Sequence, residues 1–440
     1  MEKKKSKLDF LFIGLAYFAC YFGAGNLVFP PKLGLESGTG WPGGAIGLAI
    51  SGIVLPLLAL NIISYRGGDV QSITRRVHPK LHVAMLAVLM FICMLISIPR
   101  TAAVATELGL AGIFGSVPYI PIVVAYFVIC FLVGCNKESV LDKIGKYLTP
   151  LMVVILFIVV IKGIIFPLGT PSAPTVASPT INAVLTGYQT GDVLVSVLMA
   201  AVFIGTVRDH GYKKGKEETS IVFKASIVAF ICLFVIYGGL LYIGSTVNAE
   251  YESSIGNADL LVELIRRLGG QVAMTFFGIA VVLACMTTAI GQLTSVADFY
   301  EGTRLFKGKV SYKALFIIAA AVSAGVATLG LDTIISLAAP IFSLAYAPAL
   351  VLMLLGIFQN VIPNDGGFKG AMLLTIIEAF FEMLQAYVNS PALGNILAKL
   401  PFYSQGFGWV APAVVGLVIG AIIFKLAGGV SLPKELSEEA

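Results

Sequence analysis

The stretch FGAGNLVFPPKLG, residues 22 to 34, interrupts an apolar segment with residues that suit a helix poorly. Each glycine in a helix interior costs ~1 kcal/mol relative to alanine and each proline ~3 kcal/mol, so the stretch predicts a break. Lipid offers no partner to bare backbone groups, which are tolerated only inside protein or beside a wet cavity. The break therefore predicts a binding site. Its expected donors to an anionic group such as a carboxylate are the backbone amides of Gly23, Ala24, Gly25 and Asn26.

A second group of polar atoms lies in ACMTTAIG, residues 284 to 291, within another apolar segment. The hydroxyls of Thr287 and Thr288 can bond back to carbonyls one turn earlier, as Ser and Thr often do in membrane helices. They can also ligate a hard cation together with the carbonyl of Ala284 and carbonyls freed at the first break. The expected ion is Na⁺, because none of these residues can carry a proton. The expected Na⁺ ligands are Ala19, Phe22, Ala284, Thr287 and Thr288.

Charged residues inside apolar segments form two further candidates. Arg100 and Glu107 are two turns apart and could share one helix face as an outer gate or a structural pair. Arg100 could instead bind the substrate carboxylate directly, or extend from near the helix end to the lipid headgroups. Glu378 and Glu382 are one turn apart, with Gln385 on the same stripe, and could form a proton relay or a polar seam toward another helix or partner. The three histidines all fall in connections, so none is placed to carry protons through the membrane.

The elements that must position these residues are membrane-spanning helices. Hydrophobic residues make up 58% of the 440 residues and charged residues 12%. A hydrocarbon core of ~30 Å needs ~20 apolar helical residues. Twelve segments meet this need, in a single all-α transmembrane domain over residues 1–440. They lie near 9–35, 42–65, 82–107, 119–135, 147–167, 187–206, 221–245, 271–297, 313–330, 333–358, 368–388 and 408–427, and the longest connection is a Pro, Ser and Thr-rich loop at 166–183.

The spacing of the interrupted segments predicts an inverted repeat. Secondary transporters are often built from two inverted repeats with broken central helices. The sixth span, 187–206, contains Gly187, Gly191 and Gly205 and lies five spans after the first. We therefore expect helices 1 and 6 to be broken within a 5+5 fold. The repeats would be 9–167 and 187–358, with peripheral helices 11 and 12 at 368–427.

The basic residues predict the topology. Most of the 29 Lys and Arg fall on one side if the amino terminus is inside, and the net charge of +5 reflects this bias rather than a nucleic acid partner. Both termini should then be cytoplasmic. None of the Gly-Lys pairs completes a phosphate loop, so no ATPase function or subunit is implied. No catalytic constellation is evident, so an enzyme is not expected. The six cysteines form no C-x-x-C pair and indicate no organic cofactor, zinc or redox site.

Four motifs resemble one family along essentially the whole chain. They are FGAGNLVFPPKLG, SIPRTAAVATELG (97–109), GYQTGD (187–192) and ACMTTAIG. Together they resemble the branched-chain amino acid:cation symporters (LIVCS) of bacteria. The resemblance implies Na⁺-driven, or in some members proton-driven, uptake of leucine, isoleucine and valine. It also implies the ten-helix inverted-repeat fold of neurotransmitter:sodium symporters, and the Ala-x-x-Thr-Thr spacing matches their eighth-helix sodium ligands.

The sixth span departs from the family pattern, which leaves the substrate range open. The family has Leu and Met where this chain has Gln189 and Gly191. Carbonyls near the sixth-span break should hold the ammonium group of the substrate, and an apolar pocket including Met199, Ala200 and Phe203 should hold its side chain. The expected protein is a multi-pass symporter of small apolar amino acids in the bacterial inner membrane. The alternative is a proton-coupled or uncoupled permease.

Overall fold

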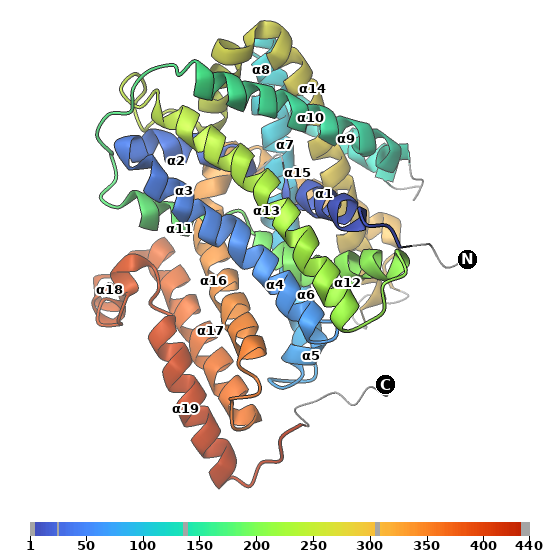
Figure 1. Ribbon diagram of the computed structural model, residues 1–440, viewed down its shortest axis with the longest axis vertical. Helices are drawn as coiled ribbons and strands as arrows, with labels where there is room; N and C mark the ends of the chain where they lie inside the picture. Colours follow the sequence, from blue (N-terminus) through green and yellow to red (C-terminus); the bar gives the residue numbers. More distant parts are fainter. Residues whose placement is uncertain (1–4, 24–25, 135–139, 304–308, 433–440) are drawn as a thin grey trace.

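The protein is an assembly of helices, seen in a computed structural model that describes residues 5–23, 26–134, 140–303 and 309–432 (Figure 1). The first helices are α1 (Asp9–Tyr21), α2 (Phe29–Ser37), η2 (Gly38–Gly40), α3 (Trp41–Ala49), η3 (Ile50–Val54), α4 (Leu55–Tyr65) and α5 (Gln71–Thr74). Next come α6 (Leu81–Ile92), η4 (Cys93–Ser97), α7 (Ile98–Val104), η5 (Ala105–Ala111), α8 (Gly112–Phe114), α9 (Tyr119–Gly134) and α10 (Val140–Ile165). The second half contains α11 (Pro179–Tyr188), α12 (Asp192–Asp209), α13 (Lys216–Ser245), α14 (Asn257–Gly302), α15 (Tyr312–Ala327) and α16 (Leu331–Ile357). The chain closes with α17 (Asp365–Val388), α18 (Pro391–Leu397), η6 (Tyr403–Gln405) and α19 (Val410–Leu426).

The first span is broken as the sequence predicts. Helix α1 ends at Tyr21, and Phe22 leaves the helical conformation with φ −77° and ψ 68°. Helix α2 begins at Phe29 with prolines in its first turn, where a missing N–H removes no helical hydrogen bond. Pro30 and Pro31 therefore start the second half-helix rather than occupy the break. Ala24 and Gly25 lie outside the described residues.

The sixth span is also broken, but it begins earlier than expected. Helices α11 and α12 are bent by 44° across the break, where Gly191 has φ 73°. The prediction of a start at 187 is wrong, because Pro179 at the first helical position begins α11 inside the segment expected to be a loop. Helix α12 then runs without interruption to Asp209, so Gly205 causes no break. The division into two repeats stays a prediction.

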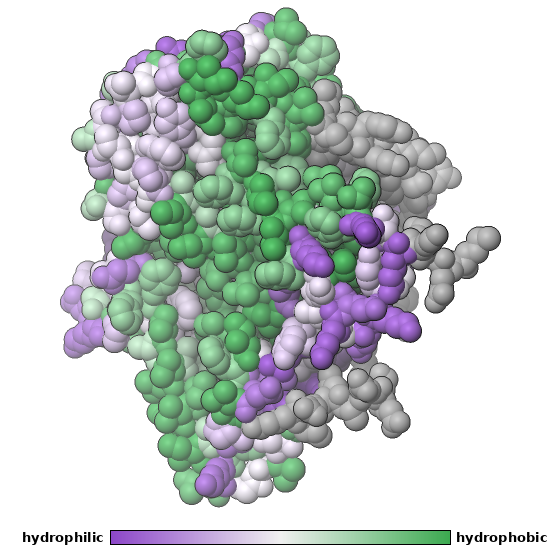
Figure 2. All heavy atoms as spheres, in the orientation of Figure 1, coloured by the Kyte–Doolittle hydropathy of each residue, from purple (hydrophilic) through white to green (hydrophobic). Residues whose placement is uncertain are grey.

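Several described helices are long and apolar enough to cross a membrane. Six meet this standard alone, and the bent pair α11 and α12 makes a seventh. Five shorter apolar helices include α1, α9 and α19. The count of twelve spans stays a prediction. In Figure 2, hydrophobic side chains cover most of the visible face, and hydrophilic ones gather near the connection between α12 and α13.

The last helices lie at the edge of the molecule. Helix α17 packs against α19 and against α16. Figure 1 shows α17 and α19 beside the rest of the bundle. Helix α13 packs on α1, α2 and α4, and so lies among the first helices of the chain. Helix α14 contains one kink, at Gly270, just before the expected eighth span.

The connections divide between two ends of the molecule, which we call the basic end and the opposite end. The basic end brings together the amino-terminal segment, the connection after α4, the connection after α12 and residues 431–432. Its contacts include Lys5 with Glu217 at 2.6 Å, Arg208 Nη2 with Gly67 O at 3.4 Å, Arg76 with Asp365 at 3.1 Å and Leu432 N with Asp365 at 2.8 Å. At the opposite end, Ser172 N donates to Asn248 Oδ1 at 2.8 Å. The amino-terminal segment and residues 431–432 therefore lie at the same end as these basic connections, and the side of the membrane that this end faces stays a prediction.

We expect the basic end to be cytoplasmic, because Lys and Arg are retained on that side. In a cysteine-free background, a cysteine introduced within residues 170–180 should be labelled by an impermeant maleimide from outside intact cells. A cysteine within 213–216 should be labelled only after the cells are opened. The reverse pattern would invert the topology.

The crossing of α2 and α13 depends on two glycines. A Cβ at Gly34 would lie 1.9 Å from the Leu241 carbonyl oxygen, and one at Gly244 would lie 2.1 Å from that of Pro31. We expect Gly34→Ala to destabilise the protein by ~1 to 3 kcal/mol, because the added methyl group would force the two helices apart. The control is Gly205→Ala on α12, where a Cβ meets nothing within 4 Å. Thermal melting in detergent gives the comparison, and equal melting temperatures for the two variants would contradict the account.

Candidate binding site

The breaks in the first and sixth spans meet through a direct side-chain contact. Asn26 lies in the first break, and Asp192 is the first residue of α12 after the second break. The Asn26 amide nitrogen donates to Asp192 Oδ1 at 3.1 Å and to Oδ2 at 3.3 Å. Both residues are buried, at 4% and 3% exposed. A carboxylate buried this deeply needs donors around it, so this contact fixes the two breaks against each other.

Arg100 joins the third span to both breaks. It projects from α7, with Nη1 donating to the Gln189 carbonyl at 3.0 Å and Nη2 to Asn26 Oδ1 at 3.5 Å. The guanidinium also lies 5.8 Å from the ring centres of Phe29 and Phe342. Its several donors in one plane suit this set of acceptors and rings. Asn26 thus bridges a buried cation and a buried anion, and we call Asn26, Arg100 and Asp192 the central cluster.

Hydroxyl groups near the central cluster join the helices around it. Tyr21, the last residue of α1, shares a hydrogen bond of 2.8 Å with Ser196 on α12. Ser196 Oγ also lies 2.8 Å from the Pro56 carbonyl oxygen of α4. Tyr346 on α16 donates to the Ser51 carbonyl at 2.6 Å, beside the π-helical turn η3. These bonds join the end of α1 to α12, α12 to the second span, and the second span to the tenth.

The predicted side-chain pocket lies along α12 rather than at the break. Ala200 follows Asp192 by eight helical positions, about 12 Å along the axis. Ala200 and Phe203 are buried, and Met199 is half-buried. The Phe203 ring lies 4.9 Å from that of Tyr17, whose hydroxyl donates to the Phe203 carbonyl at 3.1 Å. The structure therefore brings these residues against α1, while Gly23 and Asn26 lie at the first break.

The predicted cation ligands lie on two helices that pack on different neighbours. Helix α1, with Ala19 and Phe22 at its end, packs chiefly on α13, whereas α14 packs chiefly on α10 and η5. Thr287 Oγ1 and Thr288 Oγ1 each donate to the Ala284 carbonyl at 2.9 Å. These are the bonds within the helix that Ser and Thr make in membrane helices without any ion. Each hydroxyl oxygen keeps lone pairs free for a cation, so the ion site stays a prediction.

Arg100 and Glu107 bind different partners. Glu107 Oε1 accepts from Leu331 N at 2.8 Å, at the first turn of α16. A carboxylate is favourable there because a helix N-terminus carries free N–H groups and a partial positive charge. The π-helical turn η5 begins between the two residues, so α-helical spacing does not place them on one face. The gate role proposed for each residue stays a prediction.

Asp192 and the Gln189 carbonyl are site groups that the sequence pattern did not single out. Asp192 was visible as the last residue of GYQTGD and as an acidic residue inside an apolar span, which is a functional-site signal by itself. The Gln189 carbonyl could not be found this way, because any unwound residue exposes one.

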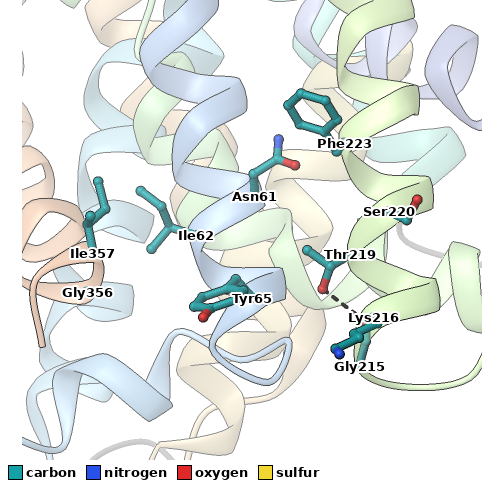
Figure 3. Close-up of a pocket in the computed structure, with 10 residues that line it drawn as sticks. All are labelled: Asn61, Ile62, Tyr65, Gly215, Lys216, Thr219, Ser220, Phe223, Gly356 and Ile357. Atoms are coloured by element: carbon teal, nitrogen blue, oxygen red, sulfur yellow. Dashed lines mark hydrogen bonds between the residues drawn. The ribbon is translucent and has the colours of Figure 1, made fainter. Parts of the chain in front are cut away.

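A groove of about 670 Å³ lies away from this cluster, at the basic end. Figure 3 shows its lining, with Asn61, Ile62 and Tyr65 from α4, Thr219 and Phe223 from α13, and Ile357 from α16. It contains none of the predicted site residues. A second groove of about 360 Å³ is lined by apolar residues of α4 and α16 together with Tyr188 and Trp409.

The fold is that of known helical membrane transporters. The chain aligns with the inward-facing conformation of Mhp1 at a TM-score of 0.62 and 13% identity, covering 96% of this chain and 92% of that one. It aligns with MhsT in complex with L-phenylalanine at a TM-score of 0.52 and 14% identity, covering 97% and 99%. At these identities the likeness shows the fold. It confirms the expected all-helical fold.

Sequence relatives define the family. The model of the branched-chain amino acid transport protein family matches residues 6–427. The chain is 31% identical over 440 residues to the branched-chain amino acid permease BraB of Bacillus subtilis, covering 98% of each. It is 28% identical to the permease BrnQ of Escherichia coli K12, covering 96% of each. The chain belongs to this family, so it is a multi-pass membrane transport protein and not an enzyme.

The central cluster gives a stability prediction. Asp192→Asn removes the anion and leaves Arg100 buried with its charge uncompensated, which costs about 3 kcal/mol. We expect a melting temperature several degrees lower in detergent. Asp209→Asn, on the exposed end of the same helix, is the control and should melt like the wild type.

The double variant Arg100→Gln with Asp192→Asn removes both charges. It should lose less stability than the sum of the single losses, because neither charge is left alone. Strict additivity would show that the two charges do not compensate each other.

Proposed function

We propose that this protein is a secondary active symporter that imports leucine, isoleucine and valine together with Na⁺ by alternating access. The observation that carries the proposal is the meeting of two broken helices at the buried central cluster. Broken helices present free amides and carbonyls near the middle of a membrane, which suit the two charged groups of an amino acid. The names of the relatives, all branched-chain amino acid permeases or carriers, support the substrate class.

The substrate carboxylate would bind the amides around Ala24 to Asn26, next to the first turn of α2. The ammonium group would bind the terminal carbonyls of α11, where the helix dipole is negative and Asp192 adds a full negative charge. The aliphatic side chain would extend toward apolar groups near the cluster. Tyr21 and Phe203 have ring centres 5.5 Å apart on the α1–α12 side, and Phe29 and Phe342 flank Arg100.

Arg100 would hold the sixth-span break rather than bind the substrate carboxylate. Its Nη1 donor is already engaged by the Gln189 carbonyl, at the point where α11 unwinds. Pinning this carbonyl orients the backbone on one side of the site. Movement of α11 during alternating access would then have to break or carry this bond, which suits the role of a gate for Arg100.

The coupling ion would be Na⁺, bound between the end of α1 and α14. The carbonyls of Ala19 and Phe22 leave the helical ladder where α1 ends, and Ala284, Thr287 and Thr288 offer three more oxygens. Closure of α1 onto α14 would complete the shell, so ion binding would be linked to conformation. Proton coupling is the second candidate, and the buried carboxylate of Asp192 at the break is the observation that favours it.

The protein would lie in the bacterial inner membrane with both termini in the cytoplasm. The ion gradient would supply the free energy that drives uptake, and no organic cofactor would take part. An amino acid, the coupling ion and lipid are the only partners that the proposal requires.

Uptake of radiolabelled amino acids into proteoliposomes tests the substrate. We expect leucine, isoleucine and valine to compete with one another with graded affinities, because one methylene in an apolar pocket is worth only ~1 to 3 kcal/mol. Lysine and glutamate should compete poorly, since the pocket would have to bury a second charge. Preferential transport of either charged amino acid would contradict the proposal.

The ion is tested by imposing Na⁺ and proton gradients separately. We expect Thr288→Ala to weaken the apparent Na⁺ affinity by ~10 to 150-fold, because an oxygen that serves a charged group is worth ~1.5 to 3 kcal/mol. Thr288→Ser keeps the oxygen and should be much milder. The matched control is Thr275→Ala, since Thr275 Oγ1 makes the same type of bond to the Gln271 carbonyl at 2.9 Å on α14. Uptake that ignores Na⁺ and follows pH would leave proton coupling.

A further inference from the structure

Glu378 on α17 is a buried carboxyl group without a hydrogen-bond partner in the described part of the chain. Glu378 is 5% exposed, and neither its Oε1 nor its Oε2 accepts a hydrogen bond. Asp365, at the start of the same helix, shows how this protein otherwise treats a buried carboxylate. Asp365 is 4% exposed, pairs with Arg76 at 3.1 Å and accepts from Leu432 N at 2.8 Å. Glu378 lacks both kinds of partner.

The nearest polar groups explain how Glu378 can stay buried. Glu382 lies four residues after Glu378 on α17, so the two carboxyl groups share one face of the helix within reach of each other. Two ionised carboxylates are acceptors only, so a hydrogen bond between them requires that one holds a proton. Two further buried polar atoms have no partner: Gln385 Oε1 on the same helix, and Trp409 Nε1 just before α19. This shortage of donors favours a carboxyl group that holds a proton, because a protonated carboxyl is itself a donor.

The surroundings contain no cation to replace a proton among the described residues. The ion pairs of the described chain do not include Glu378 or Glu382. The titratable groups near the pair are Tyr188 of α11 and Tyr403 of η6. The titratable groups on the other packed elements have partners elsewhere or lie at a distance. On α16, Tyr346 donates to the Ser51 carbonyl and Asp332 accepts from Asn257. Lys399, before η6, is exposed, and Lys425 lies at the far end of α19.

We propose that Glu378 and Glu382 form a proton-binding site, in which the two carboxyl groups share one proton, and that its occupancy controls the position of α11. The pair lies on the half of α17 remote from the basic end, because Glu378 follows Asp365 by 13 helical positions, about 20 Å. Protons would therefore reach it from the side opposite the basic end. The site is separate from the central cluster and from the five predicted Na⁺ ligands.

A packed linker connects the carboxyl pair to the sixth span. The segment 403–409 lies between them: a Cβ at Gly408 would lie 2.6 Å from Glu378 Oε1, and a Cβ at Gly406 would lie 2.3 Å from Leu185 of α11. Tyr188, at the end of α11, stacks on Tyr346 with ring centres 4.1 Å apart. The next residue, Gln189, supplies the carbonyl that binds Arg100. Loss of the shared proton would create a second buried negative charge beside this linker, and the repulsion would shift α11.

Infrared spectroscopy of the protein in lipid nanodiscs tests the proton directly and needs no substrate. We expect the wild type at neutral pH to show the C=O stretch of a protonated carboxyl group that is missing in Glu378→Gln. Glu382→Gln should shift this band, because it replaces the partner that shares the proton. The control is Glu252→Gln in the exposed connection before α14, which should leave the band unchanged. A wild-type spectrum identical to that of Glu378→Gln would overturn the site.

Leucine binding measured across pH tests the link to α11, and this readout rests on the proposed function. We expect the apparent leucine affinity of the wild type and of Glu252→Gln to change over the pH range in which the infrared band titrates. Glu378→Gln, which stays neutral, should vary by less than about twofold over that range. Equal pH profiles for wild type and Glu378→Gln would overturn the link. A wild type that binds no leucine would instead refute the proposed function, while the infrared result would still decide the proton site.

Discussion

The buried bridge of Asn26 between Asp192 and Arg100 is the interaction on which the architecture of the site depends. It joins residues from the first, third and sixth spans, all of them buried. Unwound backbone in a membrane is tolerated only where protein or water satisfies it, and here Arg100 satisfies a carbonyl of the sixth-span break. A buried charge pair is rarely worth its desolvation for stability alone. Its place between two broken helices gives it a reason to exist in a transporter.

The sequence predicts those features that are set by local backbone chemistry. Glycine, asparagine and proline between residues 23 and 31 predicted the first break, and Gly191 marked the second. The start of the sixth span was placed too late, because the stretch around Pro179 is rich in Pro, Ser and Thr and resembles a loop. Proline disfavours a helix interior but begins a helix well, and α11 begins at Pro179. Long-range contacts were not predictable. The spacing of Arg100 and Glu107 allowed them to share one helix face, but the π-helical turn η5 intervenes and each residue binds a partner far away in the sequence.

For the predicted ion ligands Thr287 and Thr288, both the sequence and the structure are compatible with a Na⁺ site and with ordinary hydrogen bonds inside a helix. The bonds of Thr287 and Thr288 to the Ala284 carbonyl are what membrane helices make without any ion. A transporter must also release its ion, so ligands divided between two helices that separate are a useful arrangement. The peripheral helices reach the sixth span as well, because Glu378 on α17 lies against Gly408 of the linker and Gly406 of the same linker lies against Leu185 of α11.

The central claim is that the two breaks together form the amino acid site. A cryo-EM structure with leucine and Na⁺ would test it most directly. The account predicts density for leucine between the breaks, with its ammonium group within hydrogen-bond distance of Asp192 or the last carbonyls of α11, and its carboxylate at the amides of residues 24 to 26. Leucine bound instead in the groove between α4, α13 and α16, with the Asn26–Asp192 contact unchanged and the breaks empty, would contradict it.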